Sequence, residues 1–298
     1  MKALFEKFLN KMNGHLSILP DKSEENAHNT LSALWHTAAG NRVSVISAQK
    51  LELPFLVSAQ IVMLENMVNS RLAGVPLAHL TERQNFMGLD YILNVGHYIP
   101  RNETELLANT AIEVLLTDYS ANLSVKVIDV CTGIGTVALA IAHYCKNTLV
   151  SGTDIYEPAI EAAKVNARHF GLNERSTFYL ASMFDPYQAL DAVSKADIIV
   201  SAPPYISTGK VKQMAQEISD HEPKEAFDAG PFGLSIFNKL ITESPDHLNK
   251  NGYLIFECGA GQGEYLAKRI RSNPAYGEVT ELSDDNGIVR VLKAKIAG

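Results

Sequence analysis

Hydrophobic positions divide the chain into two parts with different periodicities. In residues 1–80, apolar side chains recur at spacings of three and four, first between residues 5 and 12 and again between 31 and 38. A third apolar stretch runs from Pro54 to Leu72. This spacing is typical of amphipathic helices. It predicts a small N-terminal helical domain over residues 1–80.

The pattern changes near residue 85. The segment 85–91, with Gly88 at its centre, predicts a hairpin, which we place in a linker over residues 81–99. From residue 100 to 298, short β-rich apolar runs alternate with helical stretches, and this alternation predicts an α/β fold with a doubly wound parallel sheet. The final runs flank Asp284–Gly287 and predict a terminal antiparallel hairpin. The expected strands are 125–130, 148–152, 176–180, 198–201, 253–257, 279–282 and 288–295.

The composition and charge of the chain indicate a globular protein and argue against a membrane span, a nucleic-acid partner and a disulfide framework. Of the 298 residues, 46% are hydrophobic and 20% charged, as in ordinary globular proteins. No apolar run approaches the roughly 18 residues of a membrane span, and charged residues follow the first five too closely for a signal peptide, so we expect a cytoplasmic protein. The net charge of −7 argues against a nucleic-acid partner. The three cysteines lack the spacing of a disulfide framework or a metal site.

A candidate cofactor loop follows the first expected strand, at residues 129–135 (Asp-Val-Cys-Thr-Gly-Ile-Gly). Gly133 and Gly135 allow a ligand to approach the backbone, and Thr132 lies between the strand and a helix N-terminus that offers unpaired N–H groups. Asp129, at the end of the strand, fits a ligand that carries an ammonium group. Asp154 ends the next strand, where its carboxylate can accept both hydroxyls of a ribose. Adenosine with a charged amino-acid tail is S-adenosylmethionine, which we predict as the cosubstrate.

Other side chains have two interpretations at this site. Ser182 follows the third strand, where we predict a polar contact with adenine. Met183 either packs on adenine or belongs to the core. Tyr156 either lies on the ribose or adenine edge or packs on a neighbouring helix. Phe86, in the hairpin, either covers the adenine or joins the domains.

A candidate reaction site follows the fourth strand, at Ser201-Ala202-Pro203-Pro204-Tyr205. Ligands of doubly wound sheets bind at the carboxyl ends of the strands. The two prolines lack N–H groups and form a stiff wall beside the tyrosine. We predict Ser201, Pro203 and Tyr205 as catalytic, and Ala202 and Pro204 as contacts of the substrate.

The segments 74–80, 86–89, 99–107, 218–223 and 226–234, together with the Pro-Pro-Tyr motif, resemble the release-factor glutamine N5-methyltransferases from about residue 70 to the C-terminus. The resemblance implies a class I S-adenosylmethionine-dependent methyltransferase fold: Rossmann-like, with a seven-stranded doubly wound sheet and a terminal antiparallel hairpin. It places Arg101 and Thr104 near the methionine end of the cosubstrate. Arg101 has a second interpretation, a surface ion pair with Glu103. Glu222 is then either a substrate-side acid or a structural one.

Ala202 departs from the family motif, which has asparagine there. In the family, the asparagine side-chain oxygen and the carbonyl of the neighbouring proline accept the two hydrogens of the glutamine amide. Three functions therefore remain open. The first is methyl transfer to an N, O or S nucleophile on a small molecule or peptide. The second is cyclisation of S-adenosylmethionine itself to azetidine-2-carboxylate and methylthioadenosine, with Tyr205 or Ser201 contacting the amine. The third is a non-catalytic module that binds S-adenosylmethionine and contacts a partner through its N-terminal helices.

Overall fold

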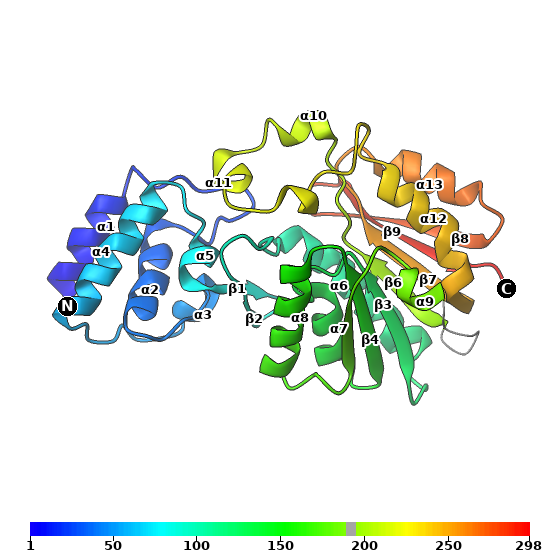
Figure 1. Ribbon diagram of the computed structural model, residues 1–298, viewed down its shortest axis with the longest axis horizontal. Helices are drawn as coiled ribbons and strands as arrows, with labels where there is room; N and C mark the ends of the chain where they lie inside the picture. Colours follow the sequence, from blue (N-terminus) through cyan, green and yellow to red (C-terminus); the bar gives the residue numbers. More distant parts are fainter. Residues whose placement is uncertain (189–194) are drawn as a thin grey trace. The chain divides into compact units, whose positions relative to one another are not determined.

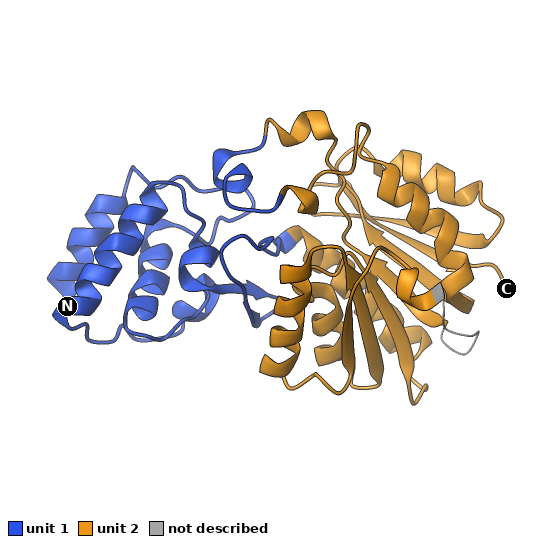
Figure 2. Cartoon of the chain, in the orientation of Figure 1, with its two compact units in different colours: residues 1–102, 214–223 blue, residues 103–213, 224–298 orange. Residues whose placement is uncertain are grey.

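The computed structural model describes residues 1–188 and 195–298, which form two compact units (Figure 2). Unit 1 comprises residues 1–102 and 214–223, and unit 2 comprises 103–213 and 224–298. The sequence predicted a helical domain, a linker and a catalytic domain in chain order. In the structure the hairpin belongs to unit 1, and residues 214–223 return to that unit from the second half of the chain.

Unit 1 is mainly helical (Figure 1). The apolar faces of its first, second and fourth helices enclose one core, with Trp35 fully buried and its indole N–H donating to Pro54 O at 2.8 Å. The Asn26 side chain caps the second helix by accepting from Asn29 N at 3.0 Å. The elements are α1 Lys2–Met12, α2 Ala27–Ala38, α3 Val45–Ala48, α4 Ser58–Leu72, α5 Leu77–Thr81, β1 Arg83–Phe86, β2 Leu89–Ile92 and α11 Gln216–Ser219.

The predicted hairpin is formed by β1 and β2, which pair antiparallel. Met87 and Gly88 connect them with φ of 51° and 78°. A two-residue loop with both residues in the left-handed region matches the twist of the flanking strands, which explains why the turn falls at Gly88.

Unit 2 contains a seven-stranded sheet in the order β5-β4-β3-β6-β7-β9-β8. The first five strands are parallel, and β9 pairs antiparallel with both β7 and β8. The predicted doubly wound sheet with a terminal hairpin is therefore confirmed. The elements are η1 Asn102–Thr104, which starts at the last residue of unit 1, then α6 Glu105–Asp118, β3 Val125–Val130, α7 Thr136–Tyr144, β4 Thr148–Asp154, α8 Glu157–His169, β5 Ser176–Leu180, α9 Asp185–Gln188, β6 Ala196–Ser201, α10 Thr208–Val211, η3 Lys224–Ala226, α12 Ser235–His247, β7 Leu248–Glu257, α13 Gly263–Arg271, β8 Tyr276–Ser283 and β9 Val289–Ile296.

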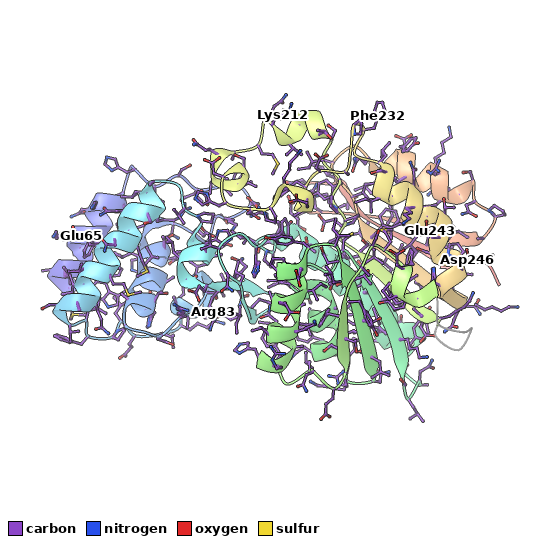
Figure 3. All side chains as sticks on the ribbon, in the orientation of Figure 1. Glu65, Arg83, Lys212, Phe232, Glu243 and Asp246 are labelled. Carbon is purple, nitrogen blue, oxygen red and sulfur yellow. The ribbon has the colours of Figure 1, made fainter. Side chains whose placement is uncertain are left out.

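Helices cover both faces of this sheet, as its apolar central strands require. On one face, α7 contacts both α6 and α8, and these three helices pack on the strands β3–β7. On the other face, α12 and α13 pack on a core that includes Phe237, Phe256 and Ile270. Helix α12 carries the charged side chains Glu243 and Asp246 away from this core (Figure 3). In the described part of the chain, no helix combines the length and apolar character needed to span a bilayer.

Strand order determines where a ligand can bind. The chain runs outward from β3 to β4 and β5, then crosses back to place β6 on the other side of β3. The carboxyl ends of β3 and β6 therefore flank a topological switch point, the usual ligand site of an open α/β sheet. Asp129 and Ser201 lie at these two ends.

Both the backbone conformation at position 135 and the close packing around it require glycine. Its φ is 83°, and a Cβ there would lie 3.0 Å from Leu139 Cδ1 and 3.2 Å from both Ala163 Cβ and Phe178 Cζ. Gly171 also has a positive φ, of 66°, but has open space around it. We expect Gly171→Ala to cost about 1–2 kcal/mol of unfolding free energy and Gly135→Ala about 1–3 kcal/mol more. Urea unfolding followed by far-ultraviolet circular dichroism measures both, and equal losses would show that the crowding at Gly135 relaxes without cost.

Candidate functional site

The loop between β3 and α7 folds back through residues in the left-handed region. Cys131, Gly133 and Gly135 have φ of 61°, 56° and 83°. Thr132 N donates to Thr153 O at 3.0 Å, which joins the loop to β4. A Cβ on Gly133 would have no neighbour within 4 Å, so the backbone there borders open space that a ligand can fill.

Asp129 is buried beneath this loop, with 1% of its surface exposed. Its Oδ2 accepts from Thr132 Oγ1 at 2.7 Å and from Ala138 N at 3.1 Å. Its Oδ1 has no hydrogen-bond partner among residues 1–188 and 195–298. Burial raises the pKa of Asp129 to about 7, although these two hydrogen bonds oppose the shift. A buried carboxylate with one unpaired oxygen fits the ammonium group of S-adenosylmethionine.

Asp154 lies beside Gly133 at the end of β4. Its Oδ2 accepts from Gly133 N at 2.9 Å, and its Oδ1 from Tyr156 N at 3.0 Å. Burial raises the pKa of Asp154, against the hydrogen bonds from the backbone of Tyr156, Gly133 and Ile155. Each carboxylate oxygen can accept more than one hydrogen bond, so both remain able to bind ribose hydroxyls. The two acids and Gly133 thus fit the predicted cosubstrate.

The segment after β5 is held mainly by the core. Met183 is 8% exposed, has a φ of 49° and accepts from Thr153 Oγ1 through its carbonyl at 2.8 Å. Phe184 is fully buried and stacks on His247 at 4.5 Å. This geometry favours the core interpretation of Met183. Ser182 and Tyr156 are half-buried at the carboxyl ends of the strands, where a ligand contact remains a prediction.

Ser201 joins the two strands at the switch point. It is fully buried, and its Oγ donates to Val130 O at 2.7 Å. This hydrogen bond favours a structural role over the predicted catalytic one. Pro203 is buried, whereas Ala202, Pro204 and Tyr205 are half-buried.

The loop after β7 fixes the position of Tyr205. This contact was not predicted from the sequence. Gln262 Nε2 donates to Tyr205 O at 3.1 Å and to Gly233 O at 3.3 Å. A Cβ on Gly259 would lie 2.9 Å from Tyr205 Cδ2, and one on Gly233 would lie 2.6 Å from Tyr205 O. Phe232, next to Gly233, remains 83% exposed (Figure 3). The only signal in the sequence was the run of glycines at 259, 261 and 263.

Glu257, the last residue of β7, is a second feature that the sequence analysis missed. It is 4% exposed, and its carboxyl is hydrogen-bonded by Thr104 and Tyr205. Its Oε2 has no hydrogen-bond partner in the described part of the chain. The predicted residues Thr104 and Tyr205, far apart in sequence, therefore meet at one buried acid.

Three other predicted residues, Phe86, Arg101 and Glu222, lie in unit 1. Arg101 Nη2 donates to Glu222 Oε1 at 2.5 Å, and Glu222 Oε2 accepts from Ile99 N at 2.9 Å. Burial alone would lower the pKa of Arg101, but the charge of Glu222 raises it above its ordinary value. The expected surface pair of Arg101 with Glu103 was wrong, because Arg101 is buried with Glu222 and Glu103 pairs with Arg290. Phe86 is fully buried with an edge-on contact to Tyr91, which favours packing within unit 1.

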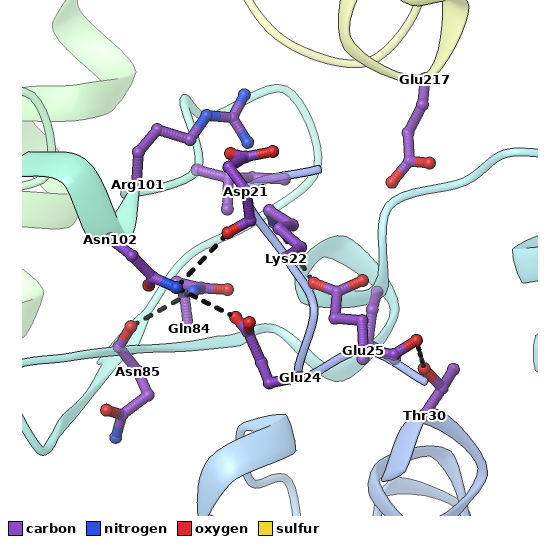
Figure 4. A network of polar contacts seen from close by, with 12 residues as sticks. Asp21, Lys22, Glu24, Glu25, Thr30, Gln84, Asn85, Arg101, Asn102 and Glu217 are labelled. Atoms are coloured by element: carbon purple, nitrogen blue, oxygen red, sulfur yellow. Dashed lines mark hydrogen bonds and ion pairs between the residues drawn. The ribbon is translucent and has the colours of Figure 1, made fainter. Parts of the chain in front are cut away.

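Polar contacts also connect the loop before α2 to the end of unit 1 (Figure 4). Asn102 Nδ2 lies 3.4 Å from both Asp21 O and Glu24 Oε1. Lys22 Nζ lies 3.3 Å from Glu25 Oε1, and both side chains are buried. Asn102, the neighbour of Arg101 in the chain, therefore has polar contacts within unit 1.

Comparison with known proteins identifies the family. Residues 108–264 match the model of the methyltransferase small domain family. The chain is 34% identical over 227 residues to the release factor glutamine methyltransferase of Moorella thermoacetica, covering 76% of this chain and 77% of that protein. It is 32% identical over 223 residues to the protein of the same name from Bacillus subtilis, covering 75% and 76%.

Among solved structures, the human methyltransferase 10 domain containing protein matches 71% of this chain and 90% of its own, with 16% identity and a TM-score of 0.51, which supports the fold. The chain belongs to the release-factor-glutamine-methyltransferase-like family of class I S-adenosylmethionine-dependent methyltransferases.

Proposed function

We propose that this enzyme transfers the methyl group of S-adenosylmethionine to an amine, hydroxyl or thiol rather than to the glutamine amide of a release factor. The observation that carries the proposal is Ala202 at the carboxyl end of β6, beside Pro203. An amide nitrogen is a weak nucleophile because its lone pair is delocalised into the carbonyl. It therefore depends on acceptors that hold its two hydrogens in place, and such positioning is worth several orders of magnitude in rate.

The residues of unit 2 have distinct roles in this proposal. Bound S-adenosylmethionine supplies an electrophilic methyl group. Asp129 holds the ammonium group, Asp154 the ribose, and the backbone at Gly133 leaves room for the ligand. Tyr205 and the two prolines form the wall on the acceptor side. Amines, hydroxyls and thiols carry a localised lone pair, so they need no acceptor from the side chain at position 202.

Cyclisation of S-adenosylmethionine is a second candidate, and one observation favours it. Ring closure requires the α-ammonium group to lose a proton before its nitrogen attacks Cγ. The pKa of Asp129 is raised by burial to about 7, and its unpaired Oδ1 is the group that we expect to face this ammonium. A carboxyl with such a pKa is suited to accept a proton near neutral pH.

Product analysis separates the two candidates. Purified protein is incubated with S-adenosylmethionine alone and with panels of small amines, alcohols and thiols, and the nucleoside products are identified by mass spectrometry. We expect S-adenosylhomocysteine to form only when an acceptor is added. Enzyme-dependent methylthioadenosine in the reaction without acceptor would contradict methyl transfer and establish cyclisation.

A further inference from the structure

Glu257 lies on the acceptor side of the switch point. The register pairs Ser201, the last residue of β6, with Phe256 of β7, so Glu257 lies level with the start of the loop after β6, which begins at Ala202. Strand β6 in turn lies beside β3, which carries Asp129. At the carboxyl ends of the strands, a buried acid therefore lies on each side of the segment 203–205: Asp129 on β3 and Glu257 on β7.

One oxygen of Glu257 has no hydrogen-bond donor of its own. The carboxyl is 4% exposed, and Thr104 and Tyr205 hydrogen-bond to it, yet Oε2 is unpaired within residues 1–188 and 195–298. Leaving a buried carboxylate oxygen unpaired costs at least about 1–3 kcal/mol. A donor supplied by a ligand would remove this cost.

The charges around Glu257 favour a cation. Arg290 of β9 is the positive group that acts on it. However, Arg290 Nη2 pairs with Glu103 Oε1 at 2.5 Å, and its Nε lies 3.6 Å from Asp284 Oδ2. Three carboxyl groups thus share one guanidinium. The groups that face Glu257 are Glu103 and Thr104 before α6, Tyr205 after β6 and Arg290 on β9, and together they leave an excess of negative charge.

We propose that Oε2 of Glu257 binds a protonated amine, and that the methyl acceptor of this enzyme is an amine. This inference deepens the proposed function and rests on it, since it assigns one acceptor class out of three. The ammonium group of the acceptor donates a hydrogen bond to Oε2. Its positive charge also balances the negative charge that Arg290 alone does not neutralise. Tyr205, hydrogen-bonded to the same carboxyl, borders the bound amine.

The chemical step balances without any further reactant. Glu257 takes one proton from the bound ammonium group and becomes neutral. The freed nitrogen lone pair forms a bond to the methyl carbon while the bond from that carbon to sulfur breaks, and the bonding pair stays on sulfur. The products are a methylated ammonium, S-adenosylhomocysteine and protonated Glu257, which releases its proton to water. Burial raises the pKa of Glu257, despite the hydrogen bonds from Thr104 and Tyr205 and the charge of Arg290, and makes it a better proton acceptor.

Sinefungin provides a direct probe, because it carries an ammonium group where S-adenosylmethionine carries its methyl group. Its affinity and that of S-adenosylhomocysteine are measured by calorimetry for wild type, Glu257→Gln and the control Glu281→Gln. Glu281 has a surface ion pair with Arg271 on the far edge of the sheet. Hydrogen bonds to charged groups are worth about 1.5–3 kcal/mol, so we expect wild type to prefer sinefungin about ten-fold or more. Glu257→Gln should lose that preference and keep its affinity for S-adenosylhomocysteine.

Each other outcome has a definite meaning. A preference that survives in Glu257→Gln overturns the proposal. If Glu257→Gln loses affinity equally for sinefungin and for S-adenosylhomocysteine, Glu257 has a structural role, and this result also overturns the proposal. Failure of the wild type to bind S-adenosylhomocysteine at all would instead contradict the proposed function. Glu281→Gln should match the wild type with both ligands.

Discussion

Replacing Asp129 with asparagine is expected to weaken the binding of S-adenosylhomocysteine on the order of 100-fold. Asparagine keeps the shape of the side chain and one oxygen that can accept from Thr132 and Ala138. It replaces the unpaired Oδ1 with an uncharged group that cannot hold an ammonium. Removing one partner of a buried, hydrogen-bonded charge pair costs about 2–5 kcal/mol, and each 1.4 kcal/mol is about ten-fold in affinity.

Asp197→Asn is the matched control for this experiment. Asp197 lies at the other end of β6, where its carboxylate accepts from Lys126 N and from Asn249 Nδ2, both at 2.8 Å. The variant removes the same charge from the same sheet, at the edge away from the ligand. Calorimetric titration with S-adenosylhomocysteine should show wild-type affinity for Asp197→Asn, and wild-type affinity for Asp129→Asn would contradict the assigned role.

The pKa of Asp129 also gives this site a pH dependence. The folded pKa of about 7 exceeds the unfolded value near 3.9, so the folded protein without ligand binds the extra proton. The stability contributed by this carboxyl is complete below about pH 4 and is lost as the pH rises through about 7. An ammonium group binds the ionised carboxylate, so affinity for S-adenosylhomocysteine should rise as the pH rises through about 7. Methylthioadenosine lacks the amino-acid tail, so an extra rise in the affinity of wild type over that of Asp129→Asn should appear with S-adenosylhomocysteine and not with methylthioadenosine.

Replacing Arg71 with methionine is expected to lower the unfolding free energy of unit 1 by about 3–5 kcal/mol, the cost of breaking a buried ion pair. Arg71 is 2% exposed. Its Nη1 lies 3.1 Å from Glu217 Oε2, and its Nη2 lies 3.4 Å from Glu25 Oε2. Methionine has a similar volume but no positive charge, so Glu25 and Glu217 both lose their ion pair with residue 71. Because Glu217 belongs to the returning segment 214–223, the same change should release that segment from unit 1.

The single tryptophan makes this prediction measurable. Trp35 is fully buried in the core of unit 1, so its fluorescence during urea unfolding reports on that unit. Arg42→Met is the control, because Arg42 forms a partly exposed pair with Glu82 and should cost less than about 1 kcal/mol. Similar losses in the two variants would contradict a role of the buried Arg71 cluster in stability.

Local periodicity accounts for the parts of the fold that were predicted well. The strand 125–130 was predicted with the bounds that the structure shows, because it is a short apolar run bordered by turn residues. The strand predicted at 253–257 begins five residues earlier, at Leu248. Its first half contains Asn249, Lys250 and Asn251, whose polar character gave no strand signal.

Long-range pairing accounts for what the sequence did not reveal. Arg71 and Glu217 are 146 positions apart, and Arg101 and Glu222 are 121 apart. No local pattern predicts such partners, so the return of residues 214–223 to unit 1 was missed. Glu257 was missed for the same reason. As one acid at the end of a buried strand, it becomes a candidate only when Thr104 and Tyr205 are seen to converge on it.

The most direct test of the proposed acceptor class uses a bacterial release factor whose glutamine is unmodified. The wild-type protein is incubated with this substrate and S-adenosylmethionine, and the intact mass of the release factor is measured. The relative from Bacillus subtilis serves as the positive control. We expect the control reaction to add one methyl group and this protein to add none. Stoichiometric methylation of the glutamine by this protein would contradict the proposal that Ala202 excludes an amide acceptor.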